Sequence, residues 1–413
     1  MSRNLLIVGA GIGQVFLLKK AKALGHKVTV LTLPGDYPCI DMADDVIYCD
    51  VFDRDKAVAE AKARGIDAVV SDQNDLMNPT VAYIAEKLGL PGNSFAQVQC
   101  YCNKIAFRNN CDKLGIPAPR HVAVSDPDFD FATFDAPFPW IVKPADSQSS
   151  VGVKRVDSLE QLRPALKVAI EKSFTNEAIV EEFFVGKEIV CEGFIESGKF
   201  RLLAFADRKY FELGDLQIPS QTLFPSRVDP EILARVVECE TKMAALVDPN
   251  FAIVHAEYLV NEATGEFRVV ESALRGGGVY ISSHLVPLAT GIDVDDLLLK
   301  KALGEPVDVE SAFAARKDRA AGYVCFLLGE GAVESVSGIE ELKSLAFVNA
   351  AFLDDMAPGA RIEKLAHKGS RKGPILVSAP NRDELDRYVE LVQKSLKIIV
   401  RGPSGNASGA IWE

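Results

Sequence analysis

Hydrophobic and polar positions follow a regular alternation over the first 95 residues of this 413-residue chain. Apolar runs typical of buried parallel strands occupy residues 4–9, 27–33, 46–50 and 67–72. Stretches with helical periodicity follow them, as far as Leu24, near 55–64 and over 78–88. Strands and helices in alternation predict a Rossmann-like α/β domain built from βαβ units.

Beyond residue 95, short apolar runs separated by turns replace this alternation. One helix is expected over 95–115, where the prolines that follow at 117 and 119 stop it. The segments FAIVHAEYLV and FRVVESAL are predicted to form a β-hairpin around Thr264 and Gly265. Residues 320–400 contain further apolar runs and end in a helix from about Arg382. These patterns predict α+β structure after the N-terminal domain.

The hairpin places two acidic side chains opposite each other. Pairing that is symmetric about Thr264 brings Glu257 and Glu271 face to face, because both are equally distant from it. Like charges at such a pair destabilise the ladder by up to about 1 kcal/mol, so a cation is expected between them. Mg²⁺ commonly binds one or two carboxylates together with substrate phosphates. A solvated hairpin face that tolerates two acids is the alternative.

A fixed cation and three glycines follow the second acid. Arg275 lies four residues after Glu271 and is followed directly by Gly276, Gly277 and Gly278. A guanidinium group offers five donors, and glycines let a ligand approach the backbone closely. The combination predicts an anion beside the metal, and therefore a metal–phosphate site.

Two lysines and a loop of small residues add phosphate-binding chemistry. Lys104 lies on the predicted helix with Arg108 one turn later, and Lys143 lies at the end of the strand PFPWIVKP. The loop from Asp146 to Gly152 can close over phosphates with backbone N–H groups and hydroxyls. An exposed basic helix face and a flexible surface hairpin are the alternatives.

Charge and composition exclude several classes of partner. The formal net charge is −12, which argues against a nucleic-acid partner, because such binding depends on clustered Lys and Arg. The sequence has no run of about 18 apolar residues and no signal-peptide pattern, so we expect a cytoplasmic protein without a membrane partner. Eight cysteines without a disulfide framework fit a reducing compartment, and the close pair Cys100 and Cys102 has no matching ligand cluster.

The first turn carries part of a dinucleotide-binding pattern. Gly9, Gly11 and Gly13 follow the first strand, but Gln14 stands where the third glycine of that pattern belongs. Asp50 comes too late in the sequence for the ribose-binding acid. A dinucleotide-dependent oxidoreductase is therefore an alternative that the sequence disfavours.

In their order along the chain, these motifs resemble the ATP-grasp ligase superfamily over roughly residues 1–400. The resemblance rests on GIPAP, VKPADSQSSVGV, VEEFFVGKEIV, HAEYLV with VVESALRGGG, and ATGID. These stretches are most similar to the branch that contains amino-acid ligases, the pyrrolysine-pathway ligase and carbamoyl-phosphate synthetase. The resemblance implies a βαβ domain followed by two α+β lobes that clamp ATP, and activation of a carboxylate as an acyl phosphate.

The pattern and the resemblance together predict four domains and a tail. They are an N-terminal βαβ domain (1–95), a small lobe or lid with the phosphate loop (96–182), a large lobe with the metal site (183–310), a small C-terminal α+β domain (311–401) and a flexible tail (402–413).

The resemblance also implies residues that contact ATP. They are Lys104, Lys143, Ser147, Ser149, Ser150, Gly152, Glu181, Glu182, Phe183 and Glu188. Within this set, the lysines and the loop are expected at the phosphates, and the main chain around Glu181 and Phe183 at adenine. Glu188 is expected to hold the ribose hydroxyls.

The same resemblance implies that Glu257 and Glu271 bind Mg²⁺, with Mn²⁺ as a substitute, and that Arg275 steadies the transferred phosphoryl group. The common pattern has Asn two residues after the second Glu, whereas this chain has Ala273 there. Carboxyaminoimidazole ribonucleotide synthetase also has Ala there, so activity is still expected. Whether one or two metal ions bind stays open, and Ser272 is expected on the other face of the strand.

The expected reaction is ATP-dependent ligation of a carboxylate to an amine, with release of ADP and phosphate. Lys143 and Arg275 are the candidate catalytic cations. His255 and His284 are candidates for the base that keeps the amine neutral. Structural hydrogen bonding is the alternative for both histidines.

The two substrates are expected to be small molecules, and a homodimer is compatible with the resemblance. Asp72 and Asp75 lie at a strand end that should face the ligand crevice, so either could bind the amine. Arg208 and Lys209 could hold a carboxylate. Plain surface exposure is the alternative for all four residues.

Two further functions stay open. An enzyme like biotin carboxylase or carboxyaminoimidazole ribonucleotide synthetase would activate bicarbonate as carboxyphosphate, and would release ADP without an amino acid. A nucleotide-binding protein without turnover is suggested by Ala273 and would bind ATP without hydrolysing it.

Overall fold

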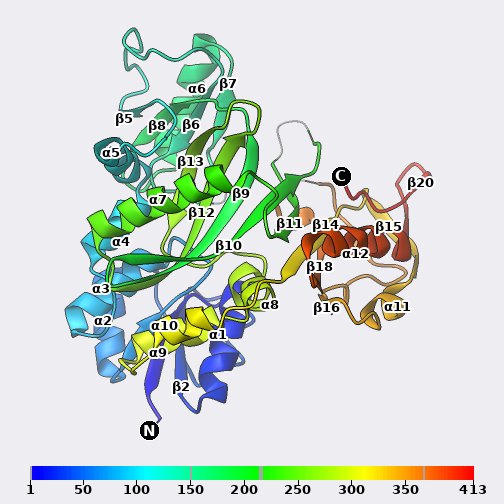
Figure 1. Ribbon diagram of the computed structural model, residues 1–413, viewed down its shortest axis with the longest axis horizontal. Helices are drawn as coiled ribbons and strands as arrows, with labels where there is room; N and C mark the ends of the chain where they lie inside the picture. Colours follow the sequence, from blue (N-terminus) through cyan, green and yellow to red (C-terminus); the bar gives the residue numbers. More distant parts are fainter. Residues whose placement is uncertain (1, 149–150, 214–216, 366–367) are drawn as a thin grey trace.

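A computed structural model describes residues 2–148, 151–213, 217–365 and 368–413. Figure 1 shows the N-terminal domain below a central sheet, a smaller lid above it and the C-terminal domain to one side. Within the described ranges, no helix combines the length and the apolar character that crossing a lipid bilayer requires.

The N-terminal domain is a four-stranded parallel sheet with the order β3-β2-β1-β4. Its elements are β1 (Asn4–Val8), α1 (Ile12–Ala23), β2 (Lys27–Thr32), β3 (Asp45–Tyr48), α2 (Arg54–Ala63), β4 (Ala68–Val70) and α3 (Asn78–Leu88). Alternate residues of β1 enter two different hydrophobic clusters, because both faces of the sheet are covered. The predicted Rossmann-like α/β domain is confirmed.

Gln14 fills the turn between β1 and α1. Its Oε1 accepts a hydrogen bond from Gly11 N (3.0 Å), and its Nε2 donates to Asp72 O (2.6 Å). A Cβ added at Gly9 would lie 3.2 Å from the Gln14 side chain. Since a dinucleotide phosphate would need this turn open, the contact further disfavours the dinucleotide-binding alternative.

The central sheet has eight antiparallel strands in the order β13-β12-β9-β10-β11-β14-β18-β16. They are β9 (Lys187–Glu196), β10 (Lys199–Tyr210), β11 (Pro219–Phe224), β12 (Phe251–Asn261), β13 (Glu266–Ala273), β14 (Ala320–Phe326), β16 (Val348–Ala351) and β18 (Lys372–Ala379). One face packs against α7 (Pro230–Val247). The other face meets the segment with a π-helix (Ile281–Leu285), α8 (Val286–Thr290) and α9 (Val294–Ala302).

The lid is a four-stranded sheet with the order β5-β8-β6-β7, covered by α6 (Leu159–Glu171). Its strands are β5 (His121–Val124), β6 (Trp140–Pro144), β7 (Lys154–Val156) and β8 (Ala178–Glu182). The helix predicted over 95–115 is instead two helices, α4 (Phe95–Cys102) and α5 (Lys104–Leu114). The chain breaks at Asn103, whose side chain accepts a hydrogen bond from Ala106 N (3.0 Å) and caps α5.

The C-terminal region shares the central sheet, since β14, β16 and β18 extend it. Its other elements are α10 (Val309–Ala314), β15 (Gly331–Ser337), α11 (Ile339–Lys343), β17 (Arg361–Ile362), a 3₁₀ turn (Lys368–Ser370), α12 (Arg382–Ser395), β19 (Lys397–Arg401) and β20 (Ala407–Ser408). The tail 402–413, expected to be flexible, is instead docked. Ile411 and Leu327 exchange two backbone hydrogen bonds (2.8 and 2.9 Å), and the Trp412 ring lies 5.0 Å from that of Phe326.

Glu240 on α7 is a buried acid held by two hydroxyls. Tyr258 Oη donates to one carboxylate oxygen (2.5 Å) and Ser272 Oγ to the other (2.9 Å), so Ser272 points away from Glu271 as expected. Burial raises the pKa of Glu240, although both hydrogen bonds lower it. The Glu240 carboxyl group therefore binds its proton more tightly in the folded protein than in the unfolded chain. The free energy of unfolding accordingly falls as the pH rises above about 4.3, the pKa of Glu in the unfolded chain.

Glu240→Gln should raise the thermal midpoint at pH 8, and the gain should shrink towards pH 5, because the amide cannot ionise. Glu240→Ala should cost about 1–3 kcal/mol at either pH, because it leaves two buried hydroxyls without their acceptor. Thermal unfolding of the three proteins at both pH values checks this. An equal effect of Glu240→Gln at pH 5 and pH 8 would contradict the assigned ionisation.

Candidate active site

The central sheet brings a row of polar side chains onto one face. Glu257 of β12 pairs directly with Glu271 of β13, so the predicted opposition of the two acids is confirmed. The register shifts after Glu257, where Tyr258 pairs with Val269, and Val270 is left as the extra residue of a bulge. The register between the turn and the bulge would place Glu257 opposite Val270, so the extra residue of the bulge is what brings Glu271 opposite Glu257.

Glu257 is already held by cations. Arg208 Nη1 donates to Glu257 Oε1 and to Glu188 Oε1 (2.7 Å), and Tyr210 Oη donates to Glu188 Oε2 (2.6 Å). Burial by itself would raise the pKa of Glu257, but Arg208 and His255 outweigh it and hold that pKa well below its usual range. Glu257 is therefore a permanent anion next to the open end of the hairpin.

Two expectations for this face need correction. Arg208, a candidate for binding a substrate carboxylate, instead bridges the two glutamates of the sheet. Lys209 follows it on the strand and so points to the opposite side, where its Nζ lies 3.9 Å from Glu413. Glu188 lies in the site as expected, but one of its oxygens is bonded to Arg208 and the other to Tyr210.

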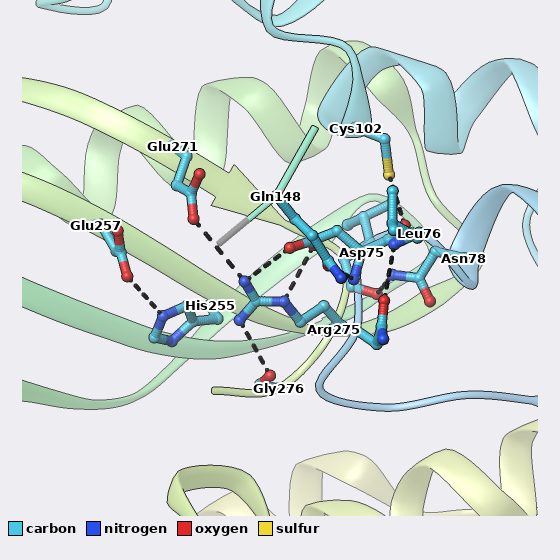
Figure 2. Close-up of polar contacts among 12 residues, drawn as sticks. Asp75, Leu76, Asn78, Cys102, Gln148, His255, Glu257, Glu271, Arg275 and Gly276 are labelled. Carbon is cyan, nitrogen blue, oxygen red and sulfur yellow. Dashed lines mark hydrogen bonds and ion pairs between the residues drawn. The ribbon is translucent and has the colours of Figure 1, made fainter. Parts of the chain in front are cut away.

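Arg275 is anchored by the N-terminal domain. Its Nε donates to Asp75 Oδ1 (3.0 Å), its Nη2 donates to Asp75 Oδ2 (2.9 Å), and its Nη1 donates to Gly276 O (3.2 Å). Figure 2 shows the guanidinium between Asp75 on one side and the hairpin acids on the other. Glu271, with 38% of its side chain exposed, has Oε1 3.9 Å from Nη2. Asp75 thus occupies the edge formed by Nε and Nη2, while Nη1 contacts the Gly276 carbonyl and Nη2 also faces Glu271.

The N-terminal domain also holds the glycines that follow Arg275. Asp72 accepts hydrogen bonds from Gly276 N (2.6 Å) and from Ser282 Oγ (2.6 Å), and Asn78 Nδ2 donates to Leu274 O (3.0 Å). Asp72 is almost completely buried, so it is not available to an amine, contrary to our expectation. Together with Asp75, it fixes the glycine loop against the strand ends of the Rossmann-like domain.

The two predicted lysines lie at the lid. Lys104 begins α5 and its Nζ donates to Ser147 O (2.6 Å), while Lys143 Nζ donates to Glu181 Oε2 (2.7 Å). Arg108 Nε donates to the other oxygen of Glu181 (2.7 Å). Burial would raise the pKa of Glu181, but Arg108 and Lys143 outweigh it and lower it to about 2. This buried network fixes Lys143 at the edge of the lid.

The expected adenine contacts need correction. Glu181 lies in the middle strand β8 and its main chain is paired with its neighbours on β5 and β6. Phe183 N donates to Pro139 O (3.1 Å). Glu182 contacts two arginines, with Arg120 Nε at 2.7 Å and Arg268 Nε at 3.6 Å. The strand pairing that builds the lid therefore uses backbone groups that we had assigned to a ligand.

The phosphate loop is described in part, because Ser149 and Ser150 lie outside the described residues. Ser147 Oγ donates to Lys172 O (2.5 Å), which directs the hydroxyl away from a ligand. Gly152 has φ +72°, and a Cβ there would lie 2.9 Å from Pro144, so the loop requires glycine at this position. Gln148 Oε1 accepts from Asp75 N (3.2 Å), so the loop contacts the residue that anchors Arg275.

Neither candidate base is supported by its surroundings. His255, 3% exposed at its side chain, contacts Glu192 through Nδ1 and Glu257 through Nε2 (3.2 Å). Burial would lower the pKa of His255, but Glu192 and Glu257 raise it overall, and both ring nitrogens already contact carboxylates. His284 lies in the π-helix with Nδ1 2.9 Å from Ser283 Oγ and its ring 4.4 Å from that of Phe16. Burial and Lys20 lower its pKa.

The sequence analysis missed Glu192, Tyr210 and the role of Arg108. Glu192 has the same strand parity as Glu188, so the period of two could have placed it on this face. The roles of Tyr210 and Arg108 could not be predicted from the residues around them in sequence, because their partners, Glu188 and Glu181, lie on other elements.

The two hairpin acids fit a metal that arrives with a nucleotide. Among the described residues, no three His, Cys, Asp or Glu side chains are arranged to hold an ion by themselves. Glu257 and Glu271 supply hard oxygens, and Mg²⁺ usually completes its shell with waters and substrate phosphates. A divalent ion bound to this site in isolation is not expected.

Three family models match this chain in order. Residues 18–92 match the ATP-grasp N-terminal domain, residues 136–283 the ATP-grasp domain, and residues 325–401 the L-amino acid ligase C-terminal domain 2. The chain is a member of the ATP-grasp superfamily of ligases, as the resemblance had implied. Its C-terminal region is of the L-amino acid ligase type.

Individual proteins agree with this assignment. The D-alanine–D-alanine ligase of Cupriavidus necator is 26% identical over 274 residues, which are 62% of this chain and 80% of that protein. D-alanine–D-alanine ligase B of Chromobacterium violaceum is 27% identical over 263 residues, 60% of this chain and 82% of its own. The crystal structure of L-amino acid ligase from Bacillus licheniformis has a TM-score of 0.79 at 24% identity and covers 97% of this chain and 99% of its own. Phosphoribosylglycinamide synthetase from Anaerococcus prevotii shares the fold with a TM-score of 0.74 at 19% identity, covering 97% of this chain and 100% of its own.

Proposed function

We propose that this protein joins the carboxylate of one amino acid to the amine of another in an ATP-dependent reaction that releases ADP and phosphate. The observation that carries the proposal is the facing pair Glu257 and Glu271 beside Arg275. The L-amino acid ligase type of the C-terminal region and the likeness to D-alanine–D-alanine ligases support amino acids as both substrates.

The proposed first step is phosphoryl transfer to the carboxylate. A carboxylate oxygen attacks the γ-phosphorus, the bond to the β–γ bridging oxygen breaks, and ADP leaves. Glu257 and Glu271 would hold Mg²⁺, which supplies charge neutralisation at the phosphates when it is bound. Lys104 and Lys143 on the lid, and Arg275 beside the two acids, would supply the positive charge around the phosphates.

The proposed second step is attack of the amine on the acyl phosphate. The amine nitrogen bonds to the acyl carbon, phosphate leaves, and the nitrogen loses a proton to give the amide. Arg275 can stabilise the charge that develops on the phosphate and acyl oxygens, because its guanidinium is fixed by Asp75. The contact of Gln148 with Asp75 holds Gln148 near the anchor of Arg275, and closure of the loop that follows would exclude water from the acyl phosphate.

A phosphate-release screen tests the proposal. The wild-type protein with Mg·ATP should release phosphate and ADP when a suitable pair of amino acids is present, and the product mass should equal the two amino acids less one water. The screen covers L- and D-amino acids, singly and in pairs, and other small carboxylic acids, with and without bicarbonate. Release that depends on bicarbonate and needs no amino acid would replace the proposal with carboxyphosphate chemistry. Binding of ATP without release under every condition would indicate a protein without turnover.

A further inference from the structure

Glu192 is a buried carboxylate beside the metal-site residues that no role has yet explained. It lies on β9 directly opposite His255 of β12, on the same face of the sheet as Glu257. The residue has no exposed surface, one carboxylate oxygen contacts His255 Nδ1, and its Oε2 has no hydrogen-bond partner among the described residues. Burying a carboxylate is costly unless its interactions compensate, so this residue needs an explanation beyond packing.

The contact continues from Glu192 through the imidazole to the hairpin acid. His255 Nε2 lies 3.2 Å from Glu257 Oε1, so the ring connects two carboxylates through its two nitrogens. A carboxylate on the far nitrogen of an imidazole fixes the rotation and the proton position of the ring. Figure 2 shows the ring directed at Glu257.

Arg208 shares the same carboxylate oxygen of Glu257 with the ring. Its Nη1 contacts Glu257 Oε1 and Glu188 Oε1, and its Nη2 lies 3.4 Å from His255 Nε2. A flexible His255 would leave Arg208 as the dominant partner of Glu257. With Glu192 in place, the ring keeps its own contact with this oxygen, so that two partners hold Glu257.

The glycine loop packs on the same pair. A Cβ added at Gly277 would lie 2.7 Å from Glu192 Oε1 and 2.8 Å from His255 Nδ1. Gly277 comes two residues after Arg275, so the backbone next to the phosphate-binding arginine lies directly on the Glu192–His255 pair. One buried contact thus supports the carboxylate Glu257 and the loop of Arg275 together.

We infer that Glu192 is a positioning residue which, through His255, holds Glu257 in the orientation that binds a divalent metal in the nucleotide complex. This inference rests on the proposed function. It differs from an ordinary buried ion pair, whose loss would lower stability without changing metal affinity selectively.

Mn²⁺ titration followed by electron paramagnetic resonance, with ADP present, tests the inference. Glu192→Leu should weaken Mn²⁺ binding about 10–100-fold, and Glu192→Gln should weaken it less, because the amide oxygen still accepts from the ring. In turnover assays the Mg²⁺ requirement should rise by a similar factor, and kcat should recover at saturating Mg²⁺. A general structural defect would not be rescued by metal.

Glu240→Gln is the matched control, because Glu240 is also a buried glutamate but contacts the opposite face of the sheet. It should shift the thermal midpoint and leave Mn²⁺ affinity unchanged.

If Glu192→Leu does not fold, Glu192→Gln and Gly277→Ala are measured in its place, and both should weaken Mn²⁺ binding. Wild-type Mn²⁺ affinity in these variants would overturn the inference and leave the proposed function intact. A wild-type protein that binds no Mn²⁺ with ADP would overturn both.

Discussion

Replacement of Arg275 by Ala should lower kcat by at least about 10²–10³-fold while ATP affinity changes far less. Removing one preorganised donor at a developing negative charge has costs of this size in other enzymes, and in the proposed reaction Arg275, fixed by Asp75 beside Glu271, stabilises the transferred phosphoryl group. The kcat of Arg275→Lys should be intermediate, because lysine keeps the positive charge but lacks the planar guanidinium group with its several donors. Steady-state kinetics with equilibrium ATP binding check the prediction, and a variant with wild-type kcat would remove Arg275 from the mechanism.

The anchor of Arg275 gives this prediction a second measurement. Asp75→Asn should lower kcat by a smaller factor, because one of the two bonds to the guanidinium loses its charged acceptor. In an Arg275→Ala background the same change should add little, since the two residues act as one unit. The exposed pair Arg64 and Asp45 (2.8 Å) in the same domain is the control, and Asp45→Asn should leave kcat unchanged. Additive losses from Asp75 and Arg275 would contradict the anchoring role.

Glu271→Gln should reduce metal-dependent turnover by at least about 100-fold without altering the circular dichroism spectrum. The amide keeps the shape of the side chain but removes the negative charge that a divalent ion requires at its hard-oxygen ligand. Since Glu271 is partly exposed and its ion pair with Arg275 is long (3.9 Å), its replacement should cost little stability.

Glu266, at the start of the same strand, provides the control for Glu271. It lies on the same strand, β13, and is exposed, so Glu266→Gln should leave both turnover and Mn²⁺ binding unchanged. Measured turnover of Glu271→Gln close to that of the wild-type protein would remove the metal assignment. The fold of the chain would be unaffected by that result.

Local patterns were sufficient to place the two acids on the arms of one β-hairpin. Glu257 and Glu271 do face each other, but the turn pairs Asn261 with Glu266, and the bulge at Val270 supplies the extra residue that brings the acids opposite each other. The helix break at Asn103 was also within reach, because Asn is a favoured N-cap residue. The Asn103 cap divides the single helix that we expected over 95–115.

Contacts between distant segments could not be predicted in the same way. Asp75 and Arg275 are 200 residues apart, and their bond depends on how the N-terminal domain docks on the central sheet. Glu192 meets His255 only because β9 and β12 are neighbours, and strand order is not a local property of the sequence. The docking of Ile411 and Trp412 was missed because the Gly- and Ser-rich composition of the tail obscured two apolar residues with specific partners.

The attachment of the Arg275 segment to Asp72, Asp75 and Asn78 has a consequence for how such ligases diversify. A recombination event that exchanged the first 90 residues for those of a relative would also exchange the groups that orient the arginine. Crossovers would therefore be tolerated only where the incoming segment brings a matching set of polar side chains after its fourth strand. The residues on both sides of this domain boundary therefore have to be inherited together.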